Sequence, residues 1–399
     1  MRARLLLLGA ALAAFGGSLL GGFHLDDYAT FAGAGPRAFG WPHPLTHILD
    51  WLNYQAAGQE PIAYHAVNLL LHLGAVLLAY ECLLRLLPPR AALIAAAIFA
   101  VHPLQAETVD YVSARGATVA AVLCFSAPLT WLERRRWLAV ALGAAALAET
   151  AGRTTSYAYA LAALRFVRLF VFPWGFTIAP DVHEPAWISI AAAVAVVAVA
   201  VWLWRAFDAR SPLTWVMVAL LLMAPGLPAP LPLFALAAAA GTLLIRERRG
   251  ALAVAAVAIL IALSIARTYV WMSDERLWRE AVRSAPELVA PKIQLAKSLR
   301  AADALELLTR ARQQAPFNAE IPAAIGKILI DEQQYQGAVD ELNRAVAMNP
   351  RDALAFNNRG VALAALGQLP AAAADFQQAL ALDPQLAEAR ENLKRLTGK

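Results

Sequence analysis

The chain has 399 residues, of which 60% are hydrophobic and only 16% are charged, and its mean hydropathy is +0.53. Soluble globular chains carry about 25% charged residues, so a wholly water-soluble protein is excluded. Residues 1–270 hold 31 charged side chains, and residues 271–399 hold 32. The sequence therefore predicts an integral membrane region followed by a water-facing module. The net charge of +5 does not indicate a nucleic-acid partner, because the arginines form short clusters between apolar runs, as membrane orientation requires.

The cysteines and the N-terminus limit the interpretation further. Cys82 and Cys124 both fall inside apolar runs, so we expect neither a structural disulfide nor a zinc site. The N-terminal stretch MRARLLLLGAALAAFGGSLLGGF resembles a signal peptide in its basic start, but its apolar part is about 19 residues long and more apolar runs follow. We interpret it as a retained first span.

The apolar runs predict a polytopic helical domain over residues 1–270 with about nine spans, because a bilayer core needs about 20 apolar residues per helix. The predicted spans are residues 4–23, 62–84, 91–101, 117–132, 137–149, 186–204, 213–225, 228–245 and 250–269. Residues 155–172 are interrupted by Arg165 and Arg168, so we expect an interfacial or re-entrant helix there, or the remnant of a lost hairpin. Residues 40–55 predict an amphipathic helix on the outer surface.

The arginine clusters predict the orientation of these spans. Clusters such as Arg134–Arg136 should lie in the cytoplasm, which places residues 24–61, residues 102–116 and everything after residue 270 on the other side. For a bacterial protein this predicts a multi-pass inner-membrane location with the C-terminal domain, residues 271–399, in the periplasm and membrane lipids around the spans.

The C-terminal domain contains an internal repeat. Pro316, Pro350 and Pro384 are spaced by 34 residues, and a 34-residue period that ends in Pro is typical of tetratricopeptide repeats (TPRs). The predicted units cover residues 289–318, 319–352 and 353–386 after a junction helix at 273–284, and the first unit lacks four residues near its turn. The fold class is thus all-α, with a TPR solenoid after the membrane domain.

Stacked TPR units leave a concave groove that binds protein segments, so we expect a protein partner, within a larger membrane complex or apart from one. Asn357, Asn358 and Arg359 offer polar contacts on one helix of the last unit. The alternative is that the repeats only cap and stabilise the membrane domain.

Two acidic residues, Asp26 and Asp27, directly follow the first span in FHLDDY. Carboxylates at a membrane boundary are costly, and such residues are functional candidates. One of them could act as a general base toward a hydroxyl or bind a divalent cation. The alternative is a solvated helix end.

Residues 102–116, HPLQAETVDYVSARG, form a second polar cluster. After the His102-Pro103 turn we expect a short helix that places Glu107 and Tyr111 on one face. Arg115 lies on the outer side, against the positive-inside bias, so we expect it to have an anionic partner. The candidates are the carboxylates of Asp26, Asp27 and Glu107, and a lipid phosphate.

His65, Asn68 and His72 form a third candidate, because they fall on one stripe of a predicted span. Polar side chains inside a span need partners within the bundle, so the stripe predicts interhelical hydrogen bonds, with a metal or phosphate site as the alternative. No Gly-rich phosphate loop, nucleophile elbow or zinc-spaced cluster occurs in the sequence, and we assign no metal.

In this order, these segments resemble the TPR-bearing membrane O-mannosyltransferases of the TMTC type and their bacterial relatives, which have a GT-C glycosyltransferase fold. The matching stretches are FHLDDY, WPHPLTHILDWLNYQAAGQEPIAYHAVNLLLHLGAVLL, AIFAVHPLQAETVDYVSARG, FPWGFTIAPDVH and RTYVWMSDERLWREAVRSAP. The resemblance implies transfer of a sugar from a polyprenyl-phosphate donor to a protein or glycan hydroxyl on the non-cytoplasmic face.

Carried over by position, the resemblance makes Asp26 or Asp27 the base and His102, Glu107 and Arg115 donor-side or organising residues. His65, Asn68 and His72 complete the candidate donor-binding or organising set.

Three departures from the family keep a second hypothesis open. His43 stands where the family has Arg, Ala148-Glu149 stands where it has Lys-Glu, and one span after that pair is missing. The alternative is a catalytically inactive relative that serves as a structural or assembly subunit through its TPR tail.

Overall fold

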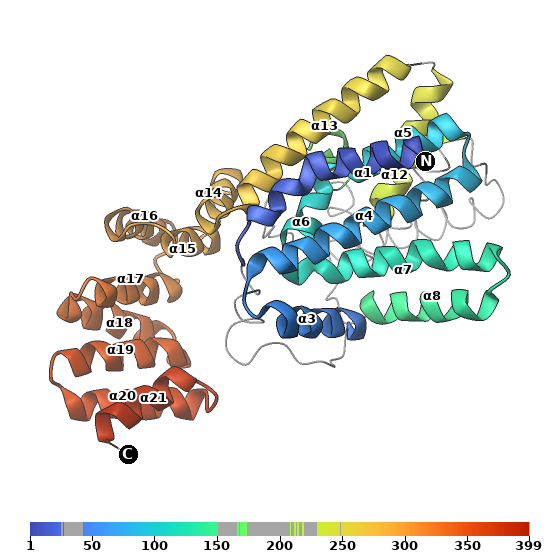
Figure 1. Cartoon of the computed structure of the whole chain (residues 1–399). Coiled ribbons are helices and arrows are strands. Elements are labelled where there is room, and N and C mark those ends of the chain that lie inside the picture. Colours follow the sequence, from blue (N-terminus) through green and yellow to red (C-terminus); the bar gives the residue numbers. More distant parts are fainter. Residues whose placement is uncertain are drawn as a thin grey trace, which may run out of the picture. The chain divides into compact units, whose positions relative to one another are not determined.

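Every regular element in the described residues of the computed structural model is a helix, and these residues fall into two compact units (Figure 1). The described residues are 1–24, 27, 43–150, 166, 168–173, 208, 211, 212, 214, 218, 230–247 and 249–398. The N-terminal unit ends at Arg276, and the C-terminal unit begins at Leu277. The all-α prediction is confirmed for this part of the chain.

In the described residues, the N-terminal unit contains α-helices and three short 3-10 helices (η). They are α1 (Arg2–Phe15), η1 (Gly16–Leu20), α3 (Pro44–Ala57), α4 (Pro61–Leu86), α5 (Pro89–Val101), η2 (Pro103–Gln105), α6 (Ala106–Asp110), η3 (Val112–Ala114), α7 (Arg115–Leu132), α8 (Arg136–Thr150), α12 (Pro230–Arg246) and α13 (Gly250–Trp271). Helices α4, α7 and α8 lie side by side (Figure 1).

Four helical stretches of the described chain are long and apolar enough to cross a membrane: Arg2–Leu20, Pro61–Leu86, Val112–Leu132 and Gly250–Trp271. A fifth would be the pair formed by α5 and residues Pro103–Asp110, which meet at a bend of 48°. Parts of α8 and α12 are apolar but shorter. Several apolar helices are thus present, whereas the predicted spans at 186–204 and 213–225 and the interfacial helix at 155–172 lie largely outside the described residues.

The bend after α5 follows from the sequence His102-Pro103. Proline lacks an amide donor and disfavours the helical conformation of the preceding residue. Accordingly His102 is extended, with φ −73° and ψ 134°, and its Nδ1 accepts the amide N–H of Leu104 at 3.2 Å. The polar segment between the bend and α7 is therefore buried within the bundle rather than continuing α5.

Helices α5 and α12 approach each other at small residues. Ala91, Ala92 and Ala95 of α5 are buried, and a Cβ atom on Gly241 of α12 would lie 2.7 Å from the carbonyl oxygen of Ala91. Small residues at such a crossing let helix backbones pack closely without a strong hydrophobic driving force. This contact holds the bent helix against the rest of the bundle.

The C-terminal unit continues from α14, which spans the boundary between the units. Its helices are α14 (Asp274–Ser284), α15 (Ala290–Ala296), α16 (Ala301–Gln314), α17 (Glu320–Asp331), α18 (Tyr335–Met348), α19 (Ala353–Ala365), α20 (Leu369–Leu382) and α21 (Ala387–Thr397). Helices α15 to α20 form three helix pairs, preceded by α14 and followed by α21. The first helix of the first pair is short: α15 has 7 residues, whereas α17, the first helix of the second pair, has 12.

The second and third repeats each contain a glycine that faces a large side chain. A Cβ on Gly326 of α17 would lie 2.5 Å from Cγ of Leu342, and a Cβ on Gly360 of α19 would lie 2.7 Å from Cε1 of Phe376. Leu342 and Phe376 belong to one buried apolar cluster. Glycine at these two positions lets paired helices pack closely, which fixes the stack and its concave surface.

Candidate functional site

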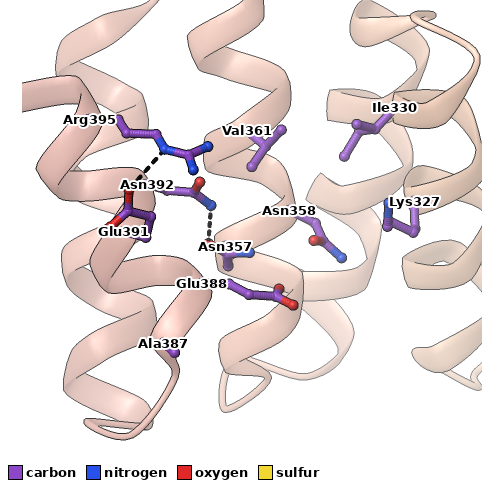
Figure 2. A pocket seen from close by; sticks show the side chains of 10 residues that line it. All are labelled: Lys327, Ile330, Asn357, Asn358, Val361, Ala387, Glu388, Glu391, Asn392 and Arg395. Carbon is purple, nitrogen blue, oxygen red and sulfur yellow. Dashed lines mark hydrogen bonds and ion pairs between the residues drawn. The ribbon is translucent and has the colours of Figure 1, made fainter. Parts of the chain in front are cut away.

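The first candidate site is a groove in the C-terminal unit between α17, α19 and α21 (Figure 2). Its volume is about 550 Å³, within the ~300–1,000 Å³ typical of ligand sites. The lining residues are Lys327, Ile330, Asn357, Asn358, Val361, Ala387, Glu388, Glu391, Asn392 and Arg395. The groove is thus lined by amides and charges around a small apolar floor, which suits a polar or peptidic ligand.

Two of the three residues predicted to bind a partner line this groove. Asn357 and Asn358 do so, although only 2% of Asn357 is exposed. Arg359 does not, so the expectation that it offers a free contact is wrong. Its guanidinium donates from Nε and Nη2 to the carboxylate of Asp375 at 2.8 and 2.7 Å, and from Nη1 to Oδ1 of Asn343 at 2.9 Å.

Arg359 therefore connects α19 to α18 and α20 instead of facing a ligand. The carboxylate of Asp375 raises the pKa of Arg359, so the side chain stays charged. The physical reason for the error is the helix period, since successive residues point about 100° apart around the axis.

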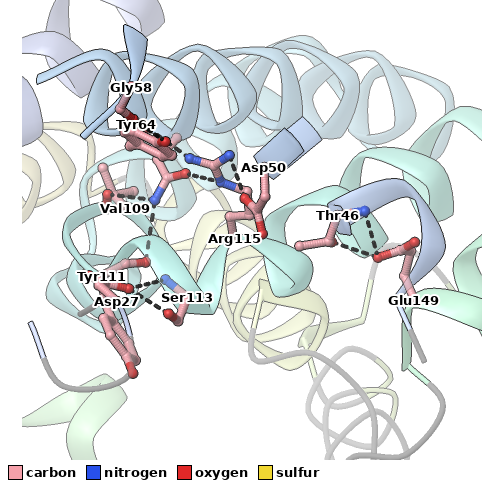
Figure 3. Close-up of polar contacts among 11 residues, drawn as sticks. Asp27, Thr46, Asp50, Gly58, Tyr64, Val109, Tyr111, Ser113, Arg115 and Glu149 are labelled. Atoms are coloured by element: carbon pink, nitrogen blue, oxygen red, sulfur yellow. Dashed lines mark hydrogen bonds and ion pairs between the residues drawn. The ribbon is translucent and has the colours of Figure 1, made fainter. Parts of the chain in front are cut away.

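The second candidate site is the arginine cluster of the N-terminal unit, in which Arg115 contacts Asp50 and Tyr64 (Figure 3) and also Asn68. Arg115, at the start of α7, has no exposed surface. It donates from Nη1 to Oδ1 of Asp50 at 2.7 Å, from Nε to Oδ1 of Asn68 at 2.9 Å and from Nη2 to the carbonyl oxygen of Tyr64 at 3.2 Å. A buried guanidinium needs such pairing, because removing one partner leaves an uncompensated charge.

The anionic partner of Arg115 among the described residues is thus Asp50, which was not one of the candidates named from the sequence. Asp27 binds elsewhere, and the side chain of Glu107 is exposed to solvent. Asp50 comes from the predicted amphipathic helix, now α3, whose buried side chains Thr46, Asp50 and Asn53 form one stripe. That stripe was the available signal, and its spacing of three and four residues is the spacing of a helix face.

Asp50 has an unusual electrostatic environment. Burial raises the pKa of its carboxyl to about 6, against the opposing effect of the Arg115 charge. The carboxylate is retained close to neutral pH because the guanidinium lies beside it. This arrangement fixes α3 on the bundle and engages Nε, Nη1 and Nη2 of Arg115 in one hydrogen bond each within the protein.

The predicted polar stripe on α4 makes hydrogen bonds to other segments. Asn68 donates from Nδ2 to the carbonyl oxygens of Val109 and Tyr111, both at 3.3 Å. His65 donates from Nε2 to the carbonyl of Gly22 at 3.0 Å, and His72 does so to the carbonyl of Ala100 at 2.9 Å. Across the described ranges no group of three His, Cys, Asp or Glu side chains could hold a metal ion.

Asp27 is fully buried, and its carboxylate accepts three hydrogen bonds. Oδ1 accepts from the amide of Ser113 at 2.7 Å and from its hydroxyl at 2.5 Å, while Oδ2 accepts from the amide of His24 at 3.1 Å. Burial raises the pKa of Asp27 despite these bonds, which lower it. Asp27 thus joins the end of the first span to the turn before Arg115. Its neighbour Asp26 lies outside the described residues.

The remaining predicted residues of segment 102–116 do not converge. His102 is buried and donates from Nε2 to the carbonyl of Phe170 at 3.0 Å, with the two rings stacked at 5.0 Å. Helix α6 ends at Asp110, and Tyr111 is extended at φ −104° and ψ 116°. The expected face shared by Glu107 and Tyr111 is therefore wrong, because the helix stops one residue too early and the Tyr111 ring stacks on Trp271 instead.

Two of the family departures meet in space. The carboxylate of Glu149 on α8 accepts from the amide of Leu45 at 2.5 Å and from the hydroxyl of Thr46 at 2.6 Å, and His43 donates from Nδ1 to the Glu149 carbonyl at 2.7 Å. An acidic group at a helix N-terminus satisfies free amides and the positive end of the dipole. Glu149 thereby holds the start of α3, the helix that carries Asp50 (Figure 3).

A further polar cluster was not predicted. Ser18, His65, Asp110, Thr268 and Trp271 line one small cavity, and the Ser18 hydroxyl, both Asp110 carboxyl oxygens and the Trp271 indole nitrogen have no hydrogen-bond partner among the described residues. These residues come from four separate segments of the chain, so no local pattern in the sequence could have shown that they meet.

Comparison with known proteins identifies the C-terminal part of the chain. Residues 325–397 match the tetratricopeptide repeat family. Over 94 residues of a TPR stretch, the chain is 40% identical to Protein O-mannosyl-transferase Tmtc1 of Drosophila melanogaster. The aligned stretch covers 23% of this chain and 11% of that protein. Over 92 residues the chain is 30% identical to Protein O-mannosyl-transferase TMTC3 of Mus musculus, and this stretch covers 23% of this chain and 10% of that protein.

Another relative is RNA polymerase II-associated protein 3 of Xenopus tropicalis, with 32% identity over 94 residues, 24% of this chain and 14% of that protein. Among solved structures, the first TPR of Spaghetti (RPAP3) bound to the HSP90 peptide SRMEEVD is 25% identical, covers 29% of this chain and 90% of that one, and has a TM-score of 0.27. The chain spans about a tenth of the length of its curated O-mannosyl-transferase relatives. Residues 325–397 thus match the TPR family, and the homology to these transferases is partial and lies in a TPR stretch.

Proposed function

We propose that the chain is a membrane-anchored protein that binds a protein partner in the groove between α17, α19 and α21. The groove itself is the observation that supports this proposal, because it is open, polar and lined by Asn357 and Asn358. The TPR match over residues 325–397 adds to it, since TPR stacks present concave surfaces to protein segments. The location that we propose is a bacterial inner membrane, with the repeats in the periplasm.

Deletion of residues 319–399 from the full-length protein tests this function. We expect the truncated chain to remain membrane-inserted, because its apolar helices are unchanged, and to lose a protein partner on co-purification. A chain truncated only after residue 397 is the control, since it keeps all of α21. If the 319–399 deletion retains every partner of the full chain, the repeats are not a docking site.

A second candidate function is sugar transfer from a polyprenyl-phosphate donor to a hydroxyl of a protein or glycan. The partial match to O-mannosyl-transferases and the family resemblance of the membrane region favour it. Asp27 is buried with its oxygens occupied, so we assign the base role to Asp26 and a positioning role to Asp27. His102 and the arginine cluster would organise the donor side, with or without a divalent cation.

Transfer from polyprenyl-phosphate mannose by the purified full chain tests the second function. Asp26→Asn should abolish transfer and leave thermal unfolding unchanged, whereas Asp27→Asn should lower the unfolding temperature. Absence of transfer in the wild type, with partner binding retained, would favour the inactive assembly subunit instead. Full transfer by Asp26→Asn would remove this residue from the mechanism.

A further inference from the structure

Three side-chain amides meet in the groove between α17, α19 and α21. Asn357 and Asn358 come from α19, and Asn392 comes from α21 (Figure 2). Asn392 donates from Nδ2 to Oδ1 of Asn357 at 3.0 Å, which fixes the orientation of both amides. Asn392 therefore keeps its oxygen as an acceptor, and Asn357 keeps its NH₂ group as a donor. The Asn358 amide makes no side-chain hydrogen bond within the described chain.

The free amide acceptors and donors of the groove are complementary above all to a peptide main chain. Each peptide unit carries one N–H and one C=O, and both are satisfied internally in a helix. Only an extended segment presents them to a binding surface, as in strand-like peptide recognition. The amides of Asn358 and Asn392 thus favour an extended segment over a helical one.

The charges of the groove select the side chains of this segment. The two cations each have an acidic neighbour one turn away on the same helix: Lys327 Nζ lies 2.6 Å from Asp331, and Arg395 Nε lies 3.0 Å from Glu391. Glu388 is exposed and has no ion pair within residues 249–398. The uncompensated charge of the groove is therefore negative, and it is complementary to Lys or Arg.

We propose that the groove binds an extended peptide segment whose backbone pairs with Asn358 and Asn392 and which places a Lys or Arg side chain against Glu388. The proposal rests on the proposed docking function and specifies its ligand. The segment needs no free C-terminus, because the groove holds no unpaired cation among its described residues to receive a carboxylate.

The test uses the full-length protein in detergent on a positional-scanning array of decapeptides blocked at both termini. The wild type should enrich Lys and Arg at one position. Glu388→Lys should change that preference to Asp and Glu, and Glu388→Gln should abolish it. Glu332→Lys, an exposed acid outside the groove, is the charge-matched control and should leave the preference unchanged.

The backbone contacts are tested separately with the best peptide from the array. Asn358→Ala should weaken binding about tenfold, and methylation of one central backbone nitrogen of the peptide should weaken it at least as much. Selection of acidic residues by the wild type, an unchanged preference in Glu388→Lys, or insensitivity to N-methylation would each overturn the proposal. If one of these outcomes is found but the 319–399 deletion still releases a partner, only this peptide ligand is rejected, and the docking function is retained.

Discussion

At the scale of single residues, Arg115 is the centre of the described polar contacts in the N-terminal unit. It joins α7 to α3 through Asp50 and to α4 through Asn68, and Asn68 in turn holds the backbone at Val109 and Tyr111. The bonds of Arg115 and the bond from Asn68 to Val109 are buried, and the bond from Asn68 to Tyr111 is partly buried. The net contribution of these bonds to the stability of the fold depends on complete pairing, since a partly satisfied buried polar network is less stable than an apolar core.

Asp50→Ala should destabilise the protein by about 3–5 kcal/mol, because it leaves the buried charge of Arg115 without an anion. The double variant Asp50→Leu/Arg115→Met removes both charges and should unfold at a higher temperature than Asp50→Ala alone. Thermal unfolding of the purified chains in detergent measures both effects. An equal decrease in unfolding temperature in the single and double variants would show that the ion pair is not what holds α3.

The sequence predicted part of this cluster. His65, Asn68 and His72 could be assigned to interhelical hydrogen bonds because polar side chains within a span need partners. Asp50 could not be matched to Arg115, since 65 residues separate them and three other acids competed as partners. The choice among them depends on where α3 packs, and packing of that kind is not encoded in a local pattern.

At the scale of helices, proline and glycine determine where elements bend and how closely they pack. Pro103 ends α5, and Gly326 and Gly360 let the paired helices of the repeats pack against Leu342 and Phe376. The 34-residue period already predicted these repeats, because it records one helix pair per unit. The end of α6 at Asp110 was not predictable in this way, since a five-residue helix has no period of its own.

Gly360→Ala should destabilise the C-terminal unit by about 1–3 kcal/mol, the usual cost of overpacking. The added Cβ would lie 2.7 Å from Cε1 of the buried Phe376 ring. Gly337→Ala on α18 is the matched control, because its Cβ would meet only Leu329 at an ordinary 3.5 Å and alanine favours a helix by up to about 1 kcal/mol. Unfolding of the full chain followed by circular dichroism compares them. A Gly360→Ala variant as stable as Gly337→Ala would contradict this account of repeat packing.

At the scale of the whole molecule, the chain combines a bundle of apolar helices with a charged TPR module. Composition alone separated these two parts, because the charge density changes near residue 270 and the compact units divide at Arg276. The side of the membrane that the repeats face follows from the arginine clusters and is a prediction. The identity of a partner could not be predicted, because the repeat signature consists almost wholly of packing positions.

Cysteine labelling on intact cells measures the orientation. In a background with Cys82→Ala and Cys124→Ala, a Gln385→Cys variant should react with a membrane-impermeant maleimide, because the arginine rule places the tail outside the cytoplasm. Arg135→Cys, in the predicted cytoplasmic loop, is the control and should react only after lysis. The reverse pattern would invert the topology.

The central claim is that the groove between α17, α19 and α21 holds a protein segment, and site-specific photo-crosslinking tests it most directly. A benzophenone amino acid is placed at Asn358 of the full-length chain in living cells and, as a control, at the exposed Gln336 of α18 outside the groove. The account predicts a discrete adduct of higher mass from position 358 that is absent from position 336. No adduct at 358, or the same adducts at both positions, would contradict it.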